Sequence, residues 1–176
     1  MNKINVGCGK EIKEGWINLD IVKGEGVDIV HNLNKFPYPF KDNEFDEIYA
    51  SHILEHLDDF LKSVKELYRI LKPKGKLFVR VPHFSSAGAF TPHHKLFFNT
   101  TAFDDITIGE DYSTSLDGTR KLFKLISKKL ILYKGLWFLN YLFEPLINLI
   151  LPHYERSFLK AIFPSPEIRF IFQKNE

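Results

Sequence analysis

The sequence predicts a doubly wound α/β fold, built on a mostly parallel sheet of seven strands with an antiparallel C-terminal strand. Three observations support this prediction. Short strand-like segments alternate with loops and one amphipathic helix over the first half of the chain, and two strand-like segments come late in it. Hydrophobic residues make up 44% of the chain, which is enough for a sizeable core. The expected organisation is therefore a single domain spanning residues 1–176.

The first four strands are expected before residue 51. They are predicted at Lys3–Val6, Trp16–Ile21, Val27–Val30 and Phe45–Ala50, where apolar residues recur in short runs next to turn residues. The segment Phe36–Phe40 contains two prolines, which favour extended loop over helix or central strand. The stretch between the first two strands is short, so a helix there is expected to be abbreviated or absent.

One strongly periodic segment predicts a helix. Apolar residues recur at three- and four-residue steps from Ile53 to Leu71, which makes one apolar helix face. Asp58 or Asp59 is suited to cap an internal restart of this helix. Pro73 and Gly75 are expected to end it, and Leu77–Val81 is predicted as the fifth strand.

The C-terminal half predicts fewer regular elements. Thr100–Ile106 is expected to form a short helix, and Lys121–Tyr133 the sixth strand. The alternation of Glu167–Gln173 predicts the last strand. Between the last two strands, at about residues 135–165, an aromatic segment predicts a helical insert.

Bulk properties exclude several functional classes. The formal net charge of the 176 residues is +2, which is too weak to indicate nucleic-acid binding. The single cysteine, Cys8, excludes an internal disulfide framework and favours a reducing compartment. Met1 leads directly into the first strand without the apolar run of a signal peptide. The apolar run Leu136–Leu151 is shorter than the ~20 residues of a membrane span. We therefore expect a cytoplasmic protein.

Candidate ligand-binding residues follow the ends of the first two strands. In open α/β sheets, ligands bind beyond the carboxyl ends of the strands, near the point where the strand order reverses. Gly7 and Gly9 close the first strand, and glycines let the backbone approach a ligand closely. Asp20 closes the second strand, where its carboxylate can accept hydrogen bonds from both hydroxyl groups of a ribose.

Two further pairs are expected at the same edge. Asn32 and Leu33 follow the third strand and offer an amide side chain and a backbone N–H to a nucleobase, and Ser51 and His52 follow the fourth. The dinucleotide fingerprint requires a third glycine where Ile12 stands. The set therefore favours a nucleoside that lacks a pyrophosphate.

These residues lie within motifs that resemble the class I S-adenosylmethionine-dependent methyltransferases, in particular a small bacterial and archaeal type. The matching segments are Asn5–Gly9, Gly15–Asp20, Phe36–Phe40, Phe45–His56 and Arg69–Leu77, with weaker matches at Thr91–His94, Phe97–Phe98 and Tyr154–Glu155. The resemblance implies a Rossmann-like seven-stranded fold and S-adenosylmethionine as the cofactor. The cofactor-binding residues that it and the strand ends indicate are Gly7, Cys8, Gly9, Asp20, Ile21, Asn32, Leu33, Ser51 and His56.

The histidines allow more than one interpretation. Methyl transfer requires a general base only if the acceptor must lose a proton. His94 is the leading candidate for that base, because it matches a histidine of the family, and His52 is the second; His83 and His93 are weaker. His52, Glu55 and His56 also form an H-x-x-E-H pattern typical of zinc peptidases. We favour a structural or cofactor-lining role for His56 and expect no metal.

The expected function is methyl transfer to an unidentified acceptor, a saccharide or another small molecule. A non-catalytic S-adenosylmethionine-binding or interaction protein is the alternative, and a zinc hydrolase is a remote one. The aromatic insert is expected to pack on the sheet or on a second subunit as a homodimer. Peripheral contact with an anionic membrane is the other interpretation, because basic residues precede the insert.

Overall fold

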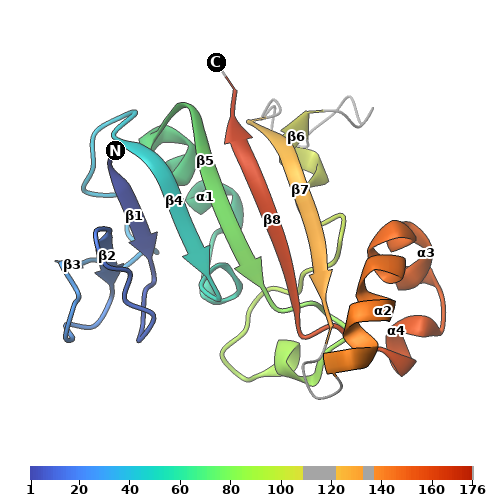
Figure 1. The fold of residues 1–176 in the computed structure, drawn as a ribbon. Coiled ribbons are helices and arrows are strands. Elements are labelled where there is room, and N and C mark those ends of the chain that lie inside the picture. Colours follow the sequence, from blue (N-terminus) through green and yellow to red (C-terminus); the bar gives the residue numbers. More distant parts are fainter. Residues whose placement is uncertain (109–121, 133–136, 176) are drawn as a thin grey trace.

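The computed structural model describes residues 1–108, 122–132 and 137–175, and it confirms the predicted α/β fold (Figure 1). Its sheet has eight strands in the order β3-β2-β1-β4-β5-β8-β7-β6. The strands are β1 (Lys3–Val6), β2 (Ile17–Asp20), β3 (Ile29–Val30), β4 (Phe45–Ser51), β5 (Leu71–Val81), β6 (Thr107–Ile108), β7 (Phe123–Ile131) and β8 (Glu167–Lys174). Seven strands were predicted. The additional strand is the two-residue β6, which pairs with the edge of β7.

The strand order runs outwards from β1 in both directions, which is the doubly wound topology. The pairs β1–β2, β2–β3, β1–β4 and β4–β5 are parallel. The C-terminal strand β8 is antiparallel to both of its neighbours, β5 and β7, as predicted. The carboxyl ends of β1 and β4 therefore adjoin at the point where the order reverses, which is where ligands bind in such sheets.

The predicted helix from Ile53 to Leu71 is divided in two. Leu54–His56 forms the 3-10 helix η1, and the α-helix α1 begins only at Phe60 and ends at Ile70. Asp59 caps α1, because its Oδ1 accepts a hydrogen bond from the Lys62 N–H at 2.9 Å. The predicted continuous helix is wrong over residues 53–59, because a side-chain cap fixes the start of the helix where periodicity alone could not.

The boundaries of two other elements also differ from the prediction. β5 begins at Leu71, six residues before the predicted start, because Leu71 pairs with Phe45 of β4 beyond a bulge in the register. The predicted helix at Thr100–Ile106 is reduced to the 3-10 helix η3, Asp104–Ile106. A further 3-10 helix, η2 (Ala87–Phe90), lies in the loop after β5. The termini of the predicted sixth strand, Lys121 and Tyr133, lie outside the described residues.

One α-helix connects the parallel strands. α1 lies behind β4 and β5 in Figure 1 and turns its buried residues Val64, Leu67 and Ile70 to the sheet. The connections between β1 and β2, β2 and β3, and β3 and β4 contain no α-helix. The expectation that the first helix is abbreviated or absent is thus confirmed, and the loops after these strands leave the carboxyl edge accessible.

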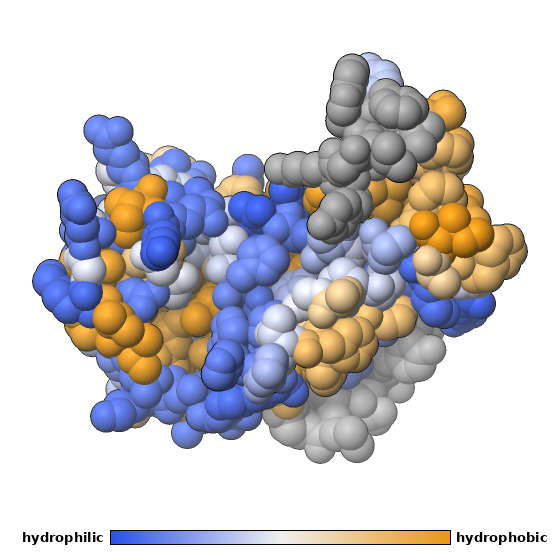
Figure 2. All heavy atoms as spheres, turned by 90° about the horizontal axis from the view of Figure 1, so that it is seen from below, coloured by the Kyte–Doolittle hydropathy of each residue, from blue (hydrophilic) through white to orange (hydrophobic). Residues whose placement is uncertain are grey.

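Three helices lie between β7 and β8: α2 (Trp137–Leu149), α3 (Leu151–Arg156) and α4 (Leu159–Ile162). They gather beside the carboxyl end of β7 rather than across the sheet (Figure 1). One side of this helical segment packs against the protein through Ile147 and Tyr154, which are buried. Hydrophobic atoms gather at the right of Figure 2. The exposed hydrophobic residues of this helical segment include Tyr141, Leu142, Leu146, Leu149, Phe158 and Ile162.

Within the described ranges, no helix combines the length and the apolar character needed to cross a membrane. Contact of the helical segment with a second subunit or with a membrane surface stays a prediction.

Candidate functional site

A glycine turn follows β1 and forms the first part of the site. Gly7 and Gly9 have positive φ angles of 65° and 49°, a conformation that glycine adopts without strain. The turn is tied to the neighbouring strand, because the Cys8 N–H donates to the Leu19 carbonyl at 3.0 Å. A Cβ atom at Gly9 would meet no atom within 4 Å. The turn therefore presents an open backbone surface at Gly9.

The carboxylate of Asp20 lies directly against this turn. Its Oδ2 accepts a hydrogen bond from the Gly9 N–H at 2.8 Å, and its Oδ1 accepts one from the Val22 N–H at 3.0 Å. Each carboxylate oxygen can accept a second hydrogen bond. The two features predicted to act together, the glycine turn and Asp20, thus end neighbouring parallel strands and touch each other.

The ends of β3 and β4 extend the same edge. The loop after β3 is held near β2, because the His31 N–H donates to the Asp20 carbonyl at 2.9 Å. Asn32 follows, with its side-chain oxygen accepting from the Asn34 N–H at 2.9 Å, and the Leu33 side chain is buried. Ser51 is the last residue of β4. Of the remaining predicted residues at this edge, Ile21 is exposed and Cys8 is buried.

His52 adopts a positive φ of 51°, and its side chain contacts Glu167 of β8. Its Nε2 lies 2.9 Å from Glu167 Oε2, and its Nδ1 lies 3.4 Å from Glu55 Oε1. Hydrogen bonds with the carboxylates of Glu167 and Glu55 raise the pKa of His52 to about 9. A histidine held in this way is protonated near neutral pH, and a protonated imidazole cannot act as a general base.

Glu167 is the centre of a charged cluster that the sequence analysis missed. Burial raises its pKa, but hydrogen bonds from His52 and two arginines outweigh burial and lower that pKa to about 2. Arg80 donates to its Oε2 from Nε at 2.9 Å and from Nη2 at 2.7 Å. These residues and Arg169 line a cavity of about 410 Å³. The contact requires β5 to pair with β8, and no local pattern shows that pairing.

His56 and His94 lie together, with ring centroids 4.8 Å apart. The Nδ1 of His56 is 3.1 Å from the His93 carbonyl, and the Nδ1 of His94 is 3.0 Å from the Ala89 carbonyl. One donor atom each from Glu55, His56 and His94 lie within 4.8 Å of one another. This group differs from the predicted H-x-x-E-H set, which consists of His52, Glu55 and His56. The ring of His52 contacts Glu167 and is not part of the group.

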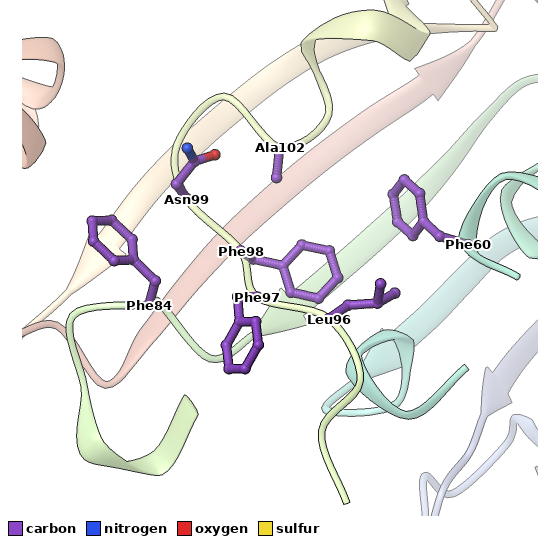
Figure 3. Close-up of a pocket in the computed structure, with 7 residues that line it drawn as sticks. All are labelled: Phe60, Phe84, Leu96, Phe97, Phe98, Asn99 and Ala102. Carbon is purple, nitrogen blue, oxygen red and sulfur yellow. The ribbon is translucent and has the colours of Figure 1, made fainter. Parts of the chain in front are cut away.

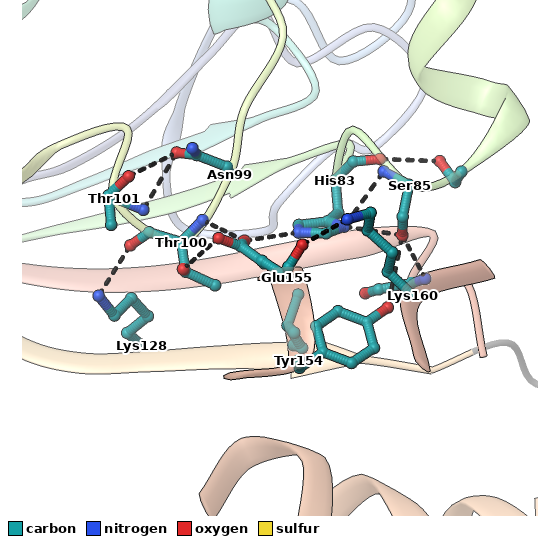
Figure 4. A network of polar contacts seen from close by, with 12 residues as sticks. His83, Ser85, Asn99, Thr100, Thr101, Lys128, Tyr154, Glu155 and Lys160 are labelled. Carbon is teal, nitrogen blue, oxygen red and sulfur yellow. Dashed lines mark hydrogen bonds and ion pairs between the residues drawn. The ribbon is translucent and has the colours of Figure 1, made fainter. Parts of the chain in front are cut away.

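His83, a weaker candidate for the base, is fully buried in a polar network (Figure 4). Its Nε2 lies 2.8 Å from Glu155 Oε1, and its Nδ1 lies 2.8 Å from Ser85 Oγ. Thr100 donates to both oxygens of Glu155, from its N–H at 2.6 Å and from its Oγ1 at 2.8 Å. This network joins α3 to the loops after β5, which favours a structural role for His83.

Two neighbouring cavities flank these loops. One, of about 470 Å³, is lined by aromatic and aliphatic side chains; Figure 3 shows Phe84, Phe97 and Phe98 around it. The other, of about 670 Å³, is more polar and includes Thr100, Lys128 and Glu155. Phe84 and Asn99 line both cavities.

Comparison with known proteins agrees with this geometry. A family model described as a methyltransferase domain matches residues 9–79. Demethylmenaquinone methyltransferase of Staphylococcus saprophyticus is 30% identical over 90 residues, which is 51% of this chain and 35% of that protein. An uncharacterized protein of Methanocaldococcus jannaschii is 54% identical over 43 residues, 24% of this chain and 19% of that protein. The chain thus spans about a third or less of the length of these relatives.

Solved structures share the fold at low sequence identity. A SAM-dependent methyltransferase from Archaeoglobus fulgidus superposes with a TM-score of 0.65 at 20% identity, over 98% of this chain and 86% of that one. The cyclase SpnF superposes with a TM-score of 0.61 at 14% identity, over 99% of this chain and 74% of that one. The predicted fold class is confirmed, and one fold carries two kinds of chemistry in these neighbours.

Proposed function

We propose that this chain is a class I methyltransferase, which binds S-adenosylmethionine at the carboxyl ends of β1, β2 and β3 and transfers the methyl group; the match of residues 9–79 to a methyltransferase domain and the fold support this. The observation that carries the proposal is the contact between Asp20 and Gly9 at 2.8 Å. It joins an open glycine turn to a carboxylate that can still accept two hydrogen bonds. That pair fits a nucleoside with two ribose hydroxyl groups.

Each part of the site has a distinct task in this proposal. The carboxylate of Asp20 accepts hydrogen bonds from the ribose, and the turn from Gly7 to Gly9 approaches the methionine part. Asn32 and the backbone of Leu33 recognise the adenine. The remaining predicted residues, Cys8, Ile21, Ser51 and His56, line the site. S-adenosylmethionine supplies an electrophilic methyl group on its sulfonium when it is bound.

The contribution of the protein to the reaction is mainly positioning. Holding two reactants in line is worth up to ~7–11 kcal/mol of the barrier, without any proton transfer. For the acceptor we propose a small molecule with an apolar ring, which enters the aromatic cavity at Phe84, Phe97 and Phe98. A saccharide is the acceptor class that the family resemblance suggests, and aromatic rings also suit its apolar face.

A non-catalytic or differently catalytic adenosyl-binding protein is the second candidate. The similarity of the fold to SpnF, a cyclase, favours it, because a methyltransferase fold alone does not determine the reaction. Turnover of a labelled methyl group with a panel of ring-bearing acceptors and saccharides separates the two candidates, because only a methyltransferase releases S-adenosylhomocysteine in step with product.

Calorimetry with S-adenosylmethionine and S-adenosylhomocysteine tests the cofactor site. We expect saturable binding of both ligands, weakened at least tenfold by Asp20→Ala, because the ribose hydroxyl groups lose their acceptor. Asp20→Asn retains an oxygen for the Gly9 N–H and should bind with intermediate affinity. Asp105→Ala removes an exposed carboxylate in η3 and should leave binding unchanged. Absence of binding at millimolar ligand, or equal binding by all variants, would contradict the proposal.

A further inference from the structure

We propose that Glu55, His56 and His94 form a binding site for a divalent transition-metal ion, with zinc as the reference ion. Their donor atoms lie within 4.8 Å of one another and come from two separate segments, η1 and the loop after η2. Two imidazoles and one carboxylate are a ligand set that zinc and other first-row transition metals bind in proteins.

The buried carboxylate of Glu55 is the second observation that points to a cation here. The side chain is 0% exposed; among the described residues, Oε2 has no hydrogen-bond partner and Oε1 has only the 3.4 Å contact with His52 Nδ1. His52 shares its two ring nitrogens between carboxylates: Nδ1 lies 3.4 Å from Glu55 Oε1, and Nε2 lies 2.9 Å from Glu167 Oε2. Leaving a buried carboxylate without hydrogen bonds is costly, so a native structure rarely retains one without a partner.

The two histidines are oriented as metal ligands usually are. A carbonyl oxygen only accepts hydrogen bonds, so the Nδ1 atoms of His56 and His94 donate to the carbonyls of His93 and Ala89. In the neutral form of each ring, Nε2 is then the nitrogen that carries the lone pair. Such backbone contacts from the second ring nitrogen fix the tautomer and the orientation of ligating histidines in metal sites.

The two segments are tied together before any ion binds. The Glu55 carbonyl accepts hydrogen bonds from the Lys95 N–H at 2.7 Å and the Leu96 N–H at 3.3 Å. The Lys95 ammonium also pairs with Asp58. Zinc holds its donors at ~2.0–2.2 Å and thus roughly 3–4 Å apart, so binding would draw these side chains together by about 1 Å.

The position of the site relates it to the proposed cofactor site. Ile53, which precedes η1, covers Gly7 so closely that a Cβ atom there would lie 2.4 Å from Ile53 Cγ1. Three protein ligands leave at least one coordination position open, as in catalytic zinc sites. Metal binding itself does not depend on the proposed methyl transfer. A role of the open coordination position in activating an acceptor hydroxyl group does rest on the proposed function. His94 would then act as a ligand rather than as the general base.

Zinc titration of untagged, EDTA-treated protein by calorimetry tests this proposal. We expect one zinc ion per chain, with affinity reduced at least tenfold in His94→Ala and Glu55→Gln, because each variant lacks a ligand. His93→Ala is the matched control, since this exposed neighbour contributes only its backbone carbonyl. Equal affinity in the wild type and both ligand variants, equal weakening by His93→Ala, or the absence of saturable binding would overturn the site.

Thermal unfolding provides a second measurement that separates metal binding from misfolding. Without metal, Glu55→Gln should unfold at nearly the same temperature as the wild type or a higher one, because the buried charge that it removes has a single long contact, to His52. Added zinc should raise the unfolding temperature of the wild type and His93→Ala, but not that of Glu55→Gln. A zinc-dependent rise in Glu55→Gln would contradict the proposal.

Binding of S-adenosylhomocysteine in the presence of EDTA distinguishes the two proposals. Retained nucleoside binding without zinc binding would reject the metal site alone, and zinc binding without nucleoside binding would reject the proposed function alone.

Discussion

At the scale of single residues, the site depends on close contacts that restrict which side chains fit. Gly7 combines a positive φ of 65° with direct packing under Ile53, whereas Gly15 has a positive φ of 74° with open space around it. Both positions would strain a residue that carries a Cβ atom, but only Gly7 would also collide with a neighbour. The collision involves Ile53 Cβ at 2.8 Å, so rotation of that side chain cannot relieve it fully.

Comparison of Gly7→Ala with Gly15→Ala by urea unfolding tests this difference. Both variants should lose about 1–2 kcal/mol of unfolding free energy through left-handed backbone strain. Gly7→Ala should lose roughly 1–3 kcal/mol more, because it overpacks Ile53. It should also bind S-adenosylhomocysteine more weakly, since the turn must shift. Equal losses in the two variants would show that the glycine turn tolerates a side chain.

At the scale of elements, a side chain rather than a strand completes the edge of β7 at its carboxyl end, beyond the residues that pair with β6. The Asn148 side chain of α2 accepts from the Leu130 N–H at 2.7 Å and donates to the Leu130 carbonyl at 2.9 Å. It thereby satisfies the backbone groups of a fully buried residue, as a neighbouring strand would. This contact explains why the helical segment lies at the carboxyl end of β7 rather than across the sheet.

Asn148→Ala should therefore weaken the attachment of α2 to β7, which the contacts of Glu144 with Lys129 and Leu132 would retain in part. We expect a loss of about 1–3 kcal/mol in unfolding free energy, because a buried N–H and a buried carbonyl lose their partner. Leu149→Ala, at the exposed neighbouring position, should change stability by less than about 0.5 kcal/mol. Hydrogen exchange should show faster exchange of the Leu130 amide in Asn148→Ala alone; protection equal to that of the wild type would contradict the assigned contact.

At the scale of the whole molecule, Glu155 connects the helical segment to the sheet. Burial raises its pKa, but hydrogen bonds from His83 and Thr100 outweigh burial, so the pKa of Glu155 in the folded protein lies below its usual value near 4.5. The pKa of Glu66 is also lowered, mainly by its hydrogen bonds with Arg69. Both carboxylates are therefore more acidic in the folded protein than in the unfolded chain.

Stability should fall in acid for this reason. A carboxylate whose pKa is lowered by folding contributes stability above the unfolded pKa of about 4.5 and loses it as the pH falls toward the folded pKa. Urea unfolding from pH 7 to pH 3 should thus show a loss of stability below about pH 4.5. Glu155→Gln should be less stable than the wild type at pH 7 and should lose less on acidification. Parallel pH profiles for the two proteins would exclude Glu155 as a contributor.

Much of the parallel half of the fold follows from local sequence. The strands β1, β2 and β4 lie within one or two residues of their predicted bounds, because short apolar runs next to glycine or polar turns determine strands locally. The contact between Asp20 and the glycine turn was predictable for a related reason: the carboxyl ends of parallel strands meet at one edge. The start of α1 was less predictable from the sequence, since two adjacent aspartates were both suited to cap the helix.

Tertiary structure alone decided which distant side chains meet. α1, β5 and η2 separate His94 from Glu55 and His56 in the sequence, and backbone contacts such as those of Lys95 and Leu96 bring the two segments together. Likewise, Arg80 reaches Glu167 because β5 pairs with β8. Periodicity and turn chemistry act between near neighbours in sequence and so determine strands and caps. Convergence of separate loops depends on the packing of the whole sheet, which no local pattern contains.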